Sequence, residues 1–205
     1  MSETGSVKFT CQRSAREIVP FKGLDDLNFV RRKLQKLGLI GVDANGIGYG
    51  NLSSRDGATN RFYITGSGTG GIAELAPSDY ARVVAYDFGR NWIQCEGSTI
   101  ASSESLTHAA VYEAAPAICA VIHCHDLNLW TALLDKAPAT DQGIEYGTPE
   151  MAREVLRLLD LTEVKMQKII VMRSHEGGLV TFGKDLQEAL GVLMDARTEN
   201  VIGEK

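Results

Sequence analysis

The chain has 205 residues, of which 44% are hydrophobic and 23% are charged, and its formal net charge is −5. These values are typical of a globular protein and predict one domain over residues 1–205, with residues 1–20 as an N-terminal extension. The lack of a long Lys/Arg cluster argues against a nucleic-acid partner, and no apolar run approaches the ~20 residues that would span a membrane.

The first half of the sequence predicts one helix followed by strands. The helix is predicted within residues 24–39, where apolar side chains recur at helical spacing and two aspartates favour the start. The residues of this pattern are Asp25, Asp26, Leu27, Val30, Leu34 and Leu37. A strand with inward-pointing polar groups is predicted within residues 46–57. A second strand, over 61–65, runs into a glycine-rich turn.

The second half of the sequence alternates strands and helices. Residues 83–88 and 91–95 predict a β-hairpin, and Ser102 and Ser103 are predicted to cap a helix that ends near Ala115. Further strands are predicted over 118–125, 168–172 and 179–182, and further helices from Leu127, Thr148 and Asp185. Hairpins mixed with helices predict an α/β fold whose sheet contains antiparallel pairs and is covered by helices.

Cysteine usage and the start of the chain bear on location. The polar first residues contain no signal-peptide apolar region, and the cysteines form no CxxC pair. They are Cys11, Cys95, Cys119 and Cys124. We therefore expect reduced, buried thiols in a cytoplasmic protein.

Three of the four histidines lie where they could hold a metal. His123 and His125 are two residues apart on an apolar strand, so both rings project from one side while Cys124 points into the core. His-x-His alone is a modest signal, since two polar residues at a strand end would look the same. His175 follows another strand and precedes two glycines, which allow a close backbone approach. Three imidazoles with one open position are typical of a catalytic zinc site, although other divalent metals also suit imidazole.

Glu104 follows the two serines at the start of a predicted helix. The helix dipole stabilises a carboxylate there, so that a capping role alone would account for it. His108 lies one turn later on the same helical face and could either hydrogen-bond to Glu104 or ligate a metal. Because the other three histidines already form a complete set, we expect His108 to be structural.

Several uncharged donors predict a phosphate site. Ser102 and Ser103 lie at a helix N-terminus, which offers free amides and positive potential to anions. The glycine-rich turn over residues 65–71 can form an anion-binding nest, although it is neither a Walker loop nor a dinucleotide-binding motif. Asn51 and Ser53 add further donors. Turn chemistry would explain each alone, but together they indicate a phosphate held by hydroxyls and amides.

In chain order, these motifs resemble those of the class II aldolase/adducin head family. They are Gly50-Asn51-Leu52-Ser53, Ile64-Thr65-Gly66-Ser67-Gly68, Ser102-Ser103-Glu104, His123-Cys124-His125 and the late His175. The resemblance covers residues 21–198. It implies a three-layer α/β/α domain with a mixed central β-sheet, in a homotetramer with active sites at subunit interfaces.

The resemblance also implies roles for individual residues. His123, His125 and His175 match the zinc ligands, and Glu104 matches the catalytic acid/base, where related 4-epimerases carry aspartate. The residues that match the phosphate-binding cradle are Asn51, Ser67, Gly68, Ser102 and Ser103.

Three departures from the family pattern lie at the rim of the implied site. The stretch 126–145 is short and contains no tyrosine, where the family's sugar-phosphate aldolases place one from a neighbouring subunit to protonate the aldehyde oxygen. His175-Glu176-Gly177-Gly178 replaces the usual His-Gly, and the chain ends soon after the last helix. The metal and phosphate positions are unaffected.

The function that we expect from the residues and the resemblance is a lyase of carbohydrate metabolism. A zinc-dependent aldolase would cleave a ketose phosphate to dihydroxyacetone phosphate and an aldehyde through an enediolate. Alternatives are a lyase like the methylthioribulose-1-phosphate dehydratases of this family, and a non-catalytic interaction module like the adducin heads. A metal-dependent decarboxylase is a further alternative. An arginine that reached the pocket and bound a substrate carboxylate would favour it.

Overall fold

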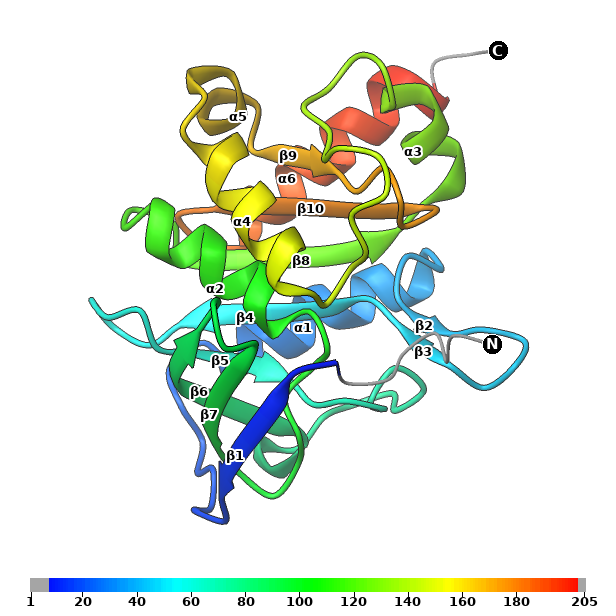
Figure 1. The fold of residues 1–205 in the computed structure, drawn as a ribbon. Coiled ribbons are helices and arrows are strands. Elements are labelled where there is room, and N and C mark those ends of the chain that lie inside the picture. The colour runs from blue at the N-terminus through cyan, green and yellow to red at the C-terminus, as the bar shows by residue number, and fades with distance from the viewer. Residues whose placement is uncertain (1–7, 203–205) are drawn as a thin grey trace.

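The computed structural model describes residues 8–202, and a mixed eight-stranded sheet crosses its centre in the order β1-β7-β6-β5-β4-β8-β10-β9 (Figure 1). Among the neighbouring strands in this order, β1 and β7 pair in parallel and the other pairs are antiparallel. The strands are β1 (Thr10–Ser14), β4 (Asn51–Arg55), β5 (Phe62–Thr65), β6 (Tyr80–Asp87), β7 (Trp92–Glu96), β8 (Ala120–His125), β9 (Ile169–Val171) and β10 (Gly178–Gly183). The predicted antiparallel pairs are confirmed.

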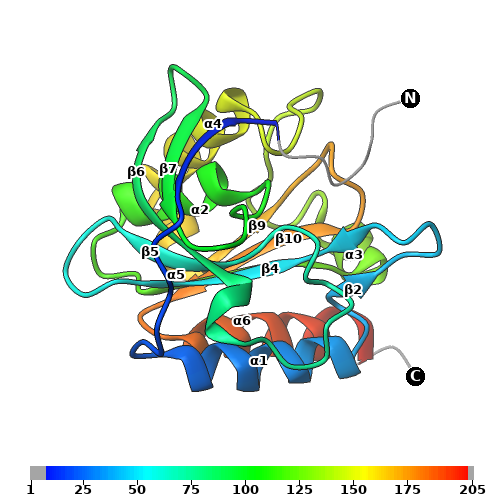
Figure 2. The same ribbon diagram turned by 90° about the horizontal axis from the view of Figure 1, so that it is seen from below.

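Helices cover both faces of the sheet, which confirms the predicted three-layer α/β/α fold (Figure 2). α1 (Leu24–Lys36) and α6 (Leu186–Arg197) lie together below the sheet in Figure 2, while α2 (Ser105–Ala114) and α4 (Pro149–Leu159) pack on each other above it. The remaining elements are α3 (Leu127–Leu133), α5 (Thr162–Gln167), the hairpin β2 (Gly41–Val42) and β3 (Gly48–Tyr49), the short helix η1 (Pro77–Asp79) and a final π-turn η2 (Thr198–Ile202).

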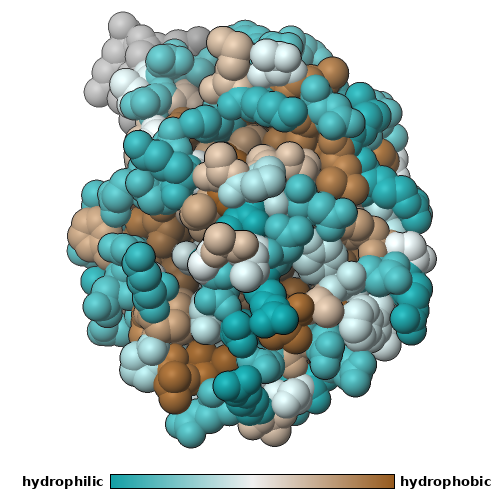
Figure 3. All heavy atoms as spheres, turned by 90° about the vertical axis from the view of Figure 1, so that its left-hand side faces the viewer, coloured by the Kyte–Doolittle hydropathy of each residue, from teal (hydrophilic) through white to brown (hydrophobic). Residues whose placement is uncertain are grey.

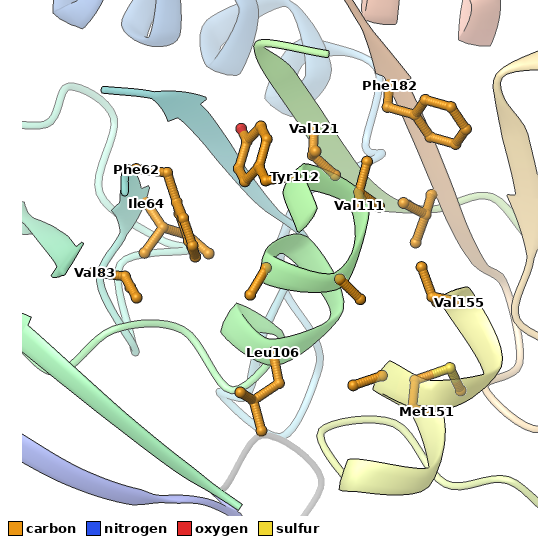
Figure 4. Close-up of a cluster of buried hydrophobic side chains, with 14 of the residues drawn as sticks. Phe62, Ile64, Val83, Leu106, Val111, Tyr112, Val121, Met151, Val155 and Phe182 are labelled. Atoms are coloured by element: carbon orange, nitrogen blue, oxygen red, sulfur yellow. The ribbon is translucent and has the colours of Figure 1, made fainter. Parts of the chain in front are cut away.

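The core between the sheet and α2 is shown in Figure 4. Leu106, Val111 and Tyr112 of α2 are fully buried, between the side chains of the sheet and those of α4. Complete burial of such a side chain contributes about 1.5–3 kcal/mol. Because α2 is packed from both sides, the position of its first turn is fixed. Glu104 immediately precedes that turn, and its position is fixed with it.

Strand β8 shows how the alternation of side chains creates a site. Ile122 and Cys124 point to the α1/α6 face and join the core there. Val121 points to the opposite face and packs in the α2/α4 core. His123 and His125 follow Val121 on that second face, at the end of the strand where a cavity opens. The predicted projection of both rings from one side is confirmed.

The structure differs from the local predictions at several points. α1 ends at Lys36, so that Leu37 lies beyond the helix and is exposed. The cap residue of α2 is Glu104, and neither Ser102 nor Ser103 caps it. The predicted N-terminal extension contributes β1 to the sheet, and α5 was not predicted. β1 was not predicted because it forms by pairing with β7, which is remote in sequence. Local sequence patterns do not encode such a pairing.

The cysteines are all free thiols. Cys95 and Cys124 are buried as predicted, whereas Cys11 and Cys119 are only partly buried. Cys11 and Cys95 bring their sulfurs to 3.1 Å of each other, across the β1–β7 pair. The prediction of burial therefore holds for two of the four.

Among the described residues, no helix is long and apolar enough to cross a membrane. Figure 3 shows one face of the molecule, on which hydrophilic side chains cover most of the area and hydrophobic ones form separate smaller patches.

Candidate metal centre and active site

Three imidazoles converge at one end of the sheet. His123 and His125 come from β8, and His175 comes from the turn between β9 and β10. One nitrogen of each ring lies within 4.8 Å of the others, and the Nε2 atoms of His125 and His175 are 2.8 Å apart. Gly178 permits this turn, since a Cβ there would lie 2.3 Å from Cδ2 of His175.

The three rings are neutral bases at neutral pH. Burial lowers the pKa of His123 to about 4, of His125 to about 3 and of His175 to about 2. Nδ1 of His123 lies 3.1 Å from the carbonyl oxygen of Leu179. An N–H at Nδ1 donates to that oxygen and leaves the Nε2 lone pair for a ligand bond.

This arrangement fits a divalent metal. Metal ligation needs unprotonated imidazoles, which is the state that burial favours here. Tetrahedral zinc with Zn–N bonds of roughly 2.0–2.1 Å places ligand nitrogens roughly 3.3 Å apart. The 2.8 Å between the Nε2 atoms of His125 and His175 and the upper limit of 4.8 Å for all three residues lie on either side of that value. With three protein ligands, one coordination position would remain for substrate.

Glu104 is a buried carboxyl group in the same cavity. It is 2% exposed, and burial raises its pKa to about 7, against a weaker opposing effect of the hydrogen bond from Thr107. The Thr107 hydroxyl donates to Oε2 over 2.8 Å, while Oε1 has no hydrogen-bond partner among the described residues. A buried oxygen without a partner is uncommon, and because this one belongs to a residue that lines the cavity, it can accept a hydrogen bond from a bound molecule.

The fourth histidine lies outside the three-imidazole group. His108 is fully buried, and its Nδ1 lies 2.7 Å from the hydroxyl of Ser53, which in turn contacts the hydroxyl of Tyr112. The group of potential metal ligands does not include it. This contact with Ser53 also removes Ser53 from the predicted set of phosphate donors, because Ser53 points into the core.

A cavity of about 1270 Å³ brings the predicted residues together. The three histidines, Glu104 and all five residues predicted for the phosphate cradle line it. The five are Asn51, Ser67, Gly68, Ser102 and Ser103. Oδ1 of Asn51 is a second buried oxygen that lacks a hydrogen-bond partner among the described residues.

The glycine-rich loop offers fewer amides than its sequence suggests. The amides of Gly66 and Ser67 donate to the backbone carbonyls of Asp79 and Ile100, each over 2.8 Å. Those of residues 68–71 donate to no backbone carbonyl of the described residues. The predicted nest is therefore limited to the second half of the loop, which begins with Gly68 in the left-handed region at a φ of 77°.

Arg31 and Gln35 of α1 hold the carbonyl side of this loop. The Arg31 guanidinium donates to the carbonyl oxygens of Thr69 and Ile72 over 2.7 and 2.5 Å. Gln35 donates to that of Gly70 over 3.0 Å. Because its carbonyls face α1, the loop can turn its amides toward the cavity.

Replacing Arg31 with methionine is expected to lower the free energy of unfolding by about 3 kcal/mol, because buried carbonyl oxygens would lose charged donors. Urea denaturation of the variant measures this loss. Arg32→Met is the matched control, since Arg32 makes only an exposed 3.6 Å pair with Glu74 and should contribute at most about 1 kcal/mol. Equal effects of the two substitutions would show that Arg31 does not hold the loop.

Several residues that line the cavity were not predicted, and three of them lie close to one another. These three are Lys8, Glu145 and Tyr146. The Tyr146 ring lies 4.2 Å, between centroids, from the ring of His175. Tyr146 follows directly after the stretch 126–145 in which no tyrosine occurs, so extending that stretch by one residue would have found it. No sequence signal marks Lys8, whose side-chain ammonium group contacts residues more than a hundred positions away.

The chain belongs to the class II aldolase/adducin family. Residues 42–196 match the model of the "Class II Aldolase and Adducin N-terminal domain". The class II aldolases of this family use a divalent metal, and a three-histidine group is present here. The chain matches none of the curated protein sequences at a significant level.

Solved structures share its fold. An L-fuculose 1-phosphate aldolase is 21% identical with a TM-score of 0.68, over 88% of this chain and 84% of the other. An L-fuculose-1-phosphate aldolase from Thermus thermophilus is 24% identical with a TM-score of 0.62, over 87% and 91%. A sugar-phosphate aldolase from Thermotoga maritima is 18% identical with a TM-score of 0.65, over 88% and 93%. At these identities the likeness establishes the fold alone.

Proposed function

We propose that this protein is a zinc-dependent lyase that cleaves a ketose phosphate into dihydroxyacetone phosphate and an aldehyde through an enediolate. One observation carries the proposal: three neutral imidazoles and a buried carboxyl group with an unpartnered oxygen line the same cavity. The similar solved structures include aldolases of sugar phosphates, which supports this substrate class.

The metal would be held by His123, His125 and His175. When bound, it would act as a Lewis acid that polarises the substrate carbonyl and favours negative charge beside it. Imidazole ligands and a vacant fourth position favour zinc among the divalent metals. In the family, assembly into a homotetramer places active sites at subunit interfaces, and we propose the same assembly here.

Glu104 is the group that moves the proton. Cleavage breaks a carbon–carbon bond: the hydroxyl group that becomes the aldehyde carbonyl gives its proton to water, and the electron pair of the broken bond stays with the fragment that keeps the phosphate. Glu104 then gives its proton to the carbon beside the carbonyl, and in the condensation direction its carboxylate removes the same proton. A pKa of about 7 leaves both forms populated near neutral pH, so that one carboxyl group can serve in both directions.

The phosphate would be bound by uncharged groups. Asn51, the loop at Ser67 and Gly68, and the serines at 102 and 103 all line the cavity. Free backbone amides and hydroxyls bind phosphate without a positive side chain.

Elemental analysis of the purified protein, combined with a screen of ketose 1-phosphates for carbonyl release, tests this function. We expect about one zinc per chain and an aldehyde fragment together with dihydroxyacetone phosphate. A diketone with an unchanged number of carbons would instead identify a dehydratase. Protein that binds neither metal nor phosphate esters would show a non-catalytic interaction module.

A further inference from the structure

One cation reaches the cavity from outside the family match. Lys8 lies two residues before the start of β1, whereas the match to the family model begins at residue 42. Among the described residues that line the cavity, Lys8 is the only lysine or arginine. The proposed phosphate cradle consists of uncharged groups and does not include Lys8, so the proposed function assigns no role to this positive charge.

The backbone of Lys8 is fixed by the sheet. The Asn91 side-chain amide donates to the carbonyl oxygen of Lys8 over 2.8 Å, and the amide of Thr10 donates to the carbonyl oxygen of Asn91 over 2.9 Å. Phe9, the next residue, is buried in the α2/α4 core. The lysine therefore occupies a defined position at the cavity, unlike one on an unanchored terminal segment.

The ammonium group of Lys8 lies against Tyr146, whose ring contacts a proposed metal ligand. It is 4.1 Å from the centroid of the Tyr146 ring, and that ring lies against His175. Burial is the main influence on the pKa values of Glu104 and His175, and the positive charge of Lys8 lowers both. Lys8 thus acts electrostatically on the part of the cavity that holds these two groups.

The present partner of the ammonium is easily exchanged. Nζ of Lys8 donates to a carboxylate oxygen of Glu145 and to the carbonyl oxygen of Tyr146, each over 3.2 Å. The Lys8 side chain is 22% exposed, whereas that of Glu145 is 73% exposed. Such an exposed partner contributes little stability and can turn to solvent. A carboxylate inside the cavity could then replace Glu145 as the partner of the Lys8 ammonium group, which is less exposed to water than Glu145 is.

We propose that Lys8 recognises a carboxylate on the substrate, a group separate from its phosphate. This inference rests on the proposed function and narrows its substrate class: the ketose phosphate is also a sugar acid, and its aldehyde fragment keeps the acid group. In the absence of substrate, the ammonium group of Lys8 pairs with the carboxylate of Glu145. When substrate binds, its carboxylate takes the place of Glu145 on the ammonium group. Neutral sugar phosphates of the same length are then poorer ligands.

Two ligands matched in carbon number test the proposal by calorimetry with the zinc-loaded protein. 3-Phosphoglycerate carries a phosphate and a carboxylate, and glycerol 3-phosphate carries the phosphate without the carboxylate. We expect 3-phosphoglycerate to bind at least about tenfold more tightly, as a charge-assisted hydrogen bond predicts. Lys8→Met should abolish this preference and change the affinity for glycerol 3-phosphate by no more than about twofold.

Glu145→Gln provides a second, independent readout with the opposite sign. Removing the competing carboxylate should increase the preference for 3-phosphoglycerate several-fold, an effect that a purely structural Lys8–Glu145 pair would not produce. A preference that persists in Lys8→Met would overturn the proposal, because the carboxylate would then bind the metal.

The remaining outcomes separate this inference from the proposed function. Binding of glycerol 3-phosphate with no preference for 3-phosphoglycerate in the wild type would overturn the role of Lys8 and leave the phosphate cradle standing. Failure of both ligands to bind the wild type would overturn both.

Discussion

Replacing Glu104 with glutamine is expected to lower turnover by about 10²–10⁴-fold, while the protein keeps its metal. Glutamine preserves the shape of the side chain and can still accept the hydrogen bond from Thr107, but it cannot carry the proton. The histidines that would bind the metal are untouched. Turnover and metal content, measured on the same preparation, therefore separate proton transfer from metal binding.

Glu176→Gln is the matched control for this prediction. Glu176 lines the same cavity but is exposed, so its substitution removes a negative charge at the rim without affecting a buried proton. Its turnover should stay within a few-fold of the wild type. If Glu104→Gln retained wild-type turnover, another group would have to move the proton.

The pH dependence of stability shows whether the Glu104→Gln variant is folded and whether Glu104 is desolvated. The folded-state pKa of about 7 lies above the usual 4.5, so the folded protein binds this proton more tightly than the unfolded chain does. The resulting stability is complete below pH 4.5 and is lost as pH rises through 7. Relative to the metal-free wild type, the variant should gain about 3 kcal/mol between those limits in urea denaturation.

Much of the fold was accessible from local patterns. Alternation along β8 places the rings of His123 and His125 on one face, because side chains two apart on a strand share a side. Thr148 and Asp185 cap α4 and α6 as predicted. The side chain of each accepts a hydrogen bond from the backbone amide three residues later in the chain. These features depend on neighbouring residues alone, and therefore the sequence encodes them directly.

Features that depend on distant contacts were not accessible. The glycine-rich loop looks like a complete nest, yet Gly66 and Ser67 lose their amides to carbonyls that belong to other segments. The position of Lys8 follows from pairing between β1 and β7. Glu104 was expected within the first turn of its helix but is the cap residue, where packing of α2 against two layers sets the boundary. In each case tertiary contacts decide between local alternatives.

Replacing His175 with alanine is expected to abolish stoichiometric zinc binding and, with it, catalysis. His123 and His125 alone leave two protein ligands, which is fewer than the three typical of catalytic zinc. At a free metal concentration of about 100 times the dissociation constant, zinc should stabilise the wild type by about 2.7 kcal/mol. For a protein of this size, that corresponds to a rise of about 5–10 °C in the unfolding midpoint.

The fourth histidine supplies the control for the His175 substitution. His108→Asn removes an imidazole of the same kind, but one whose Nδ1 contacts Ser53 outside the three-imidazole group. This variant should keep one zinc per chain and show the zinc-dependent rise in its unfolding midpoint, even if its metal-free stability is lower. Zinc retained by His175→Ala and lost by His108→Asn would contradict the ligand assignment, because the metal would then lie deeper, between the sheet and α2.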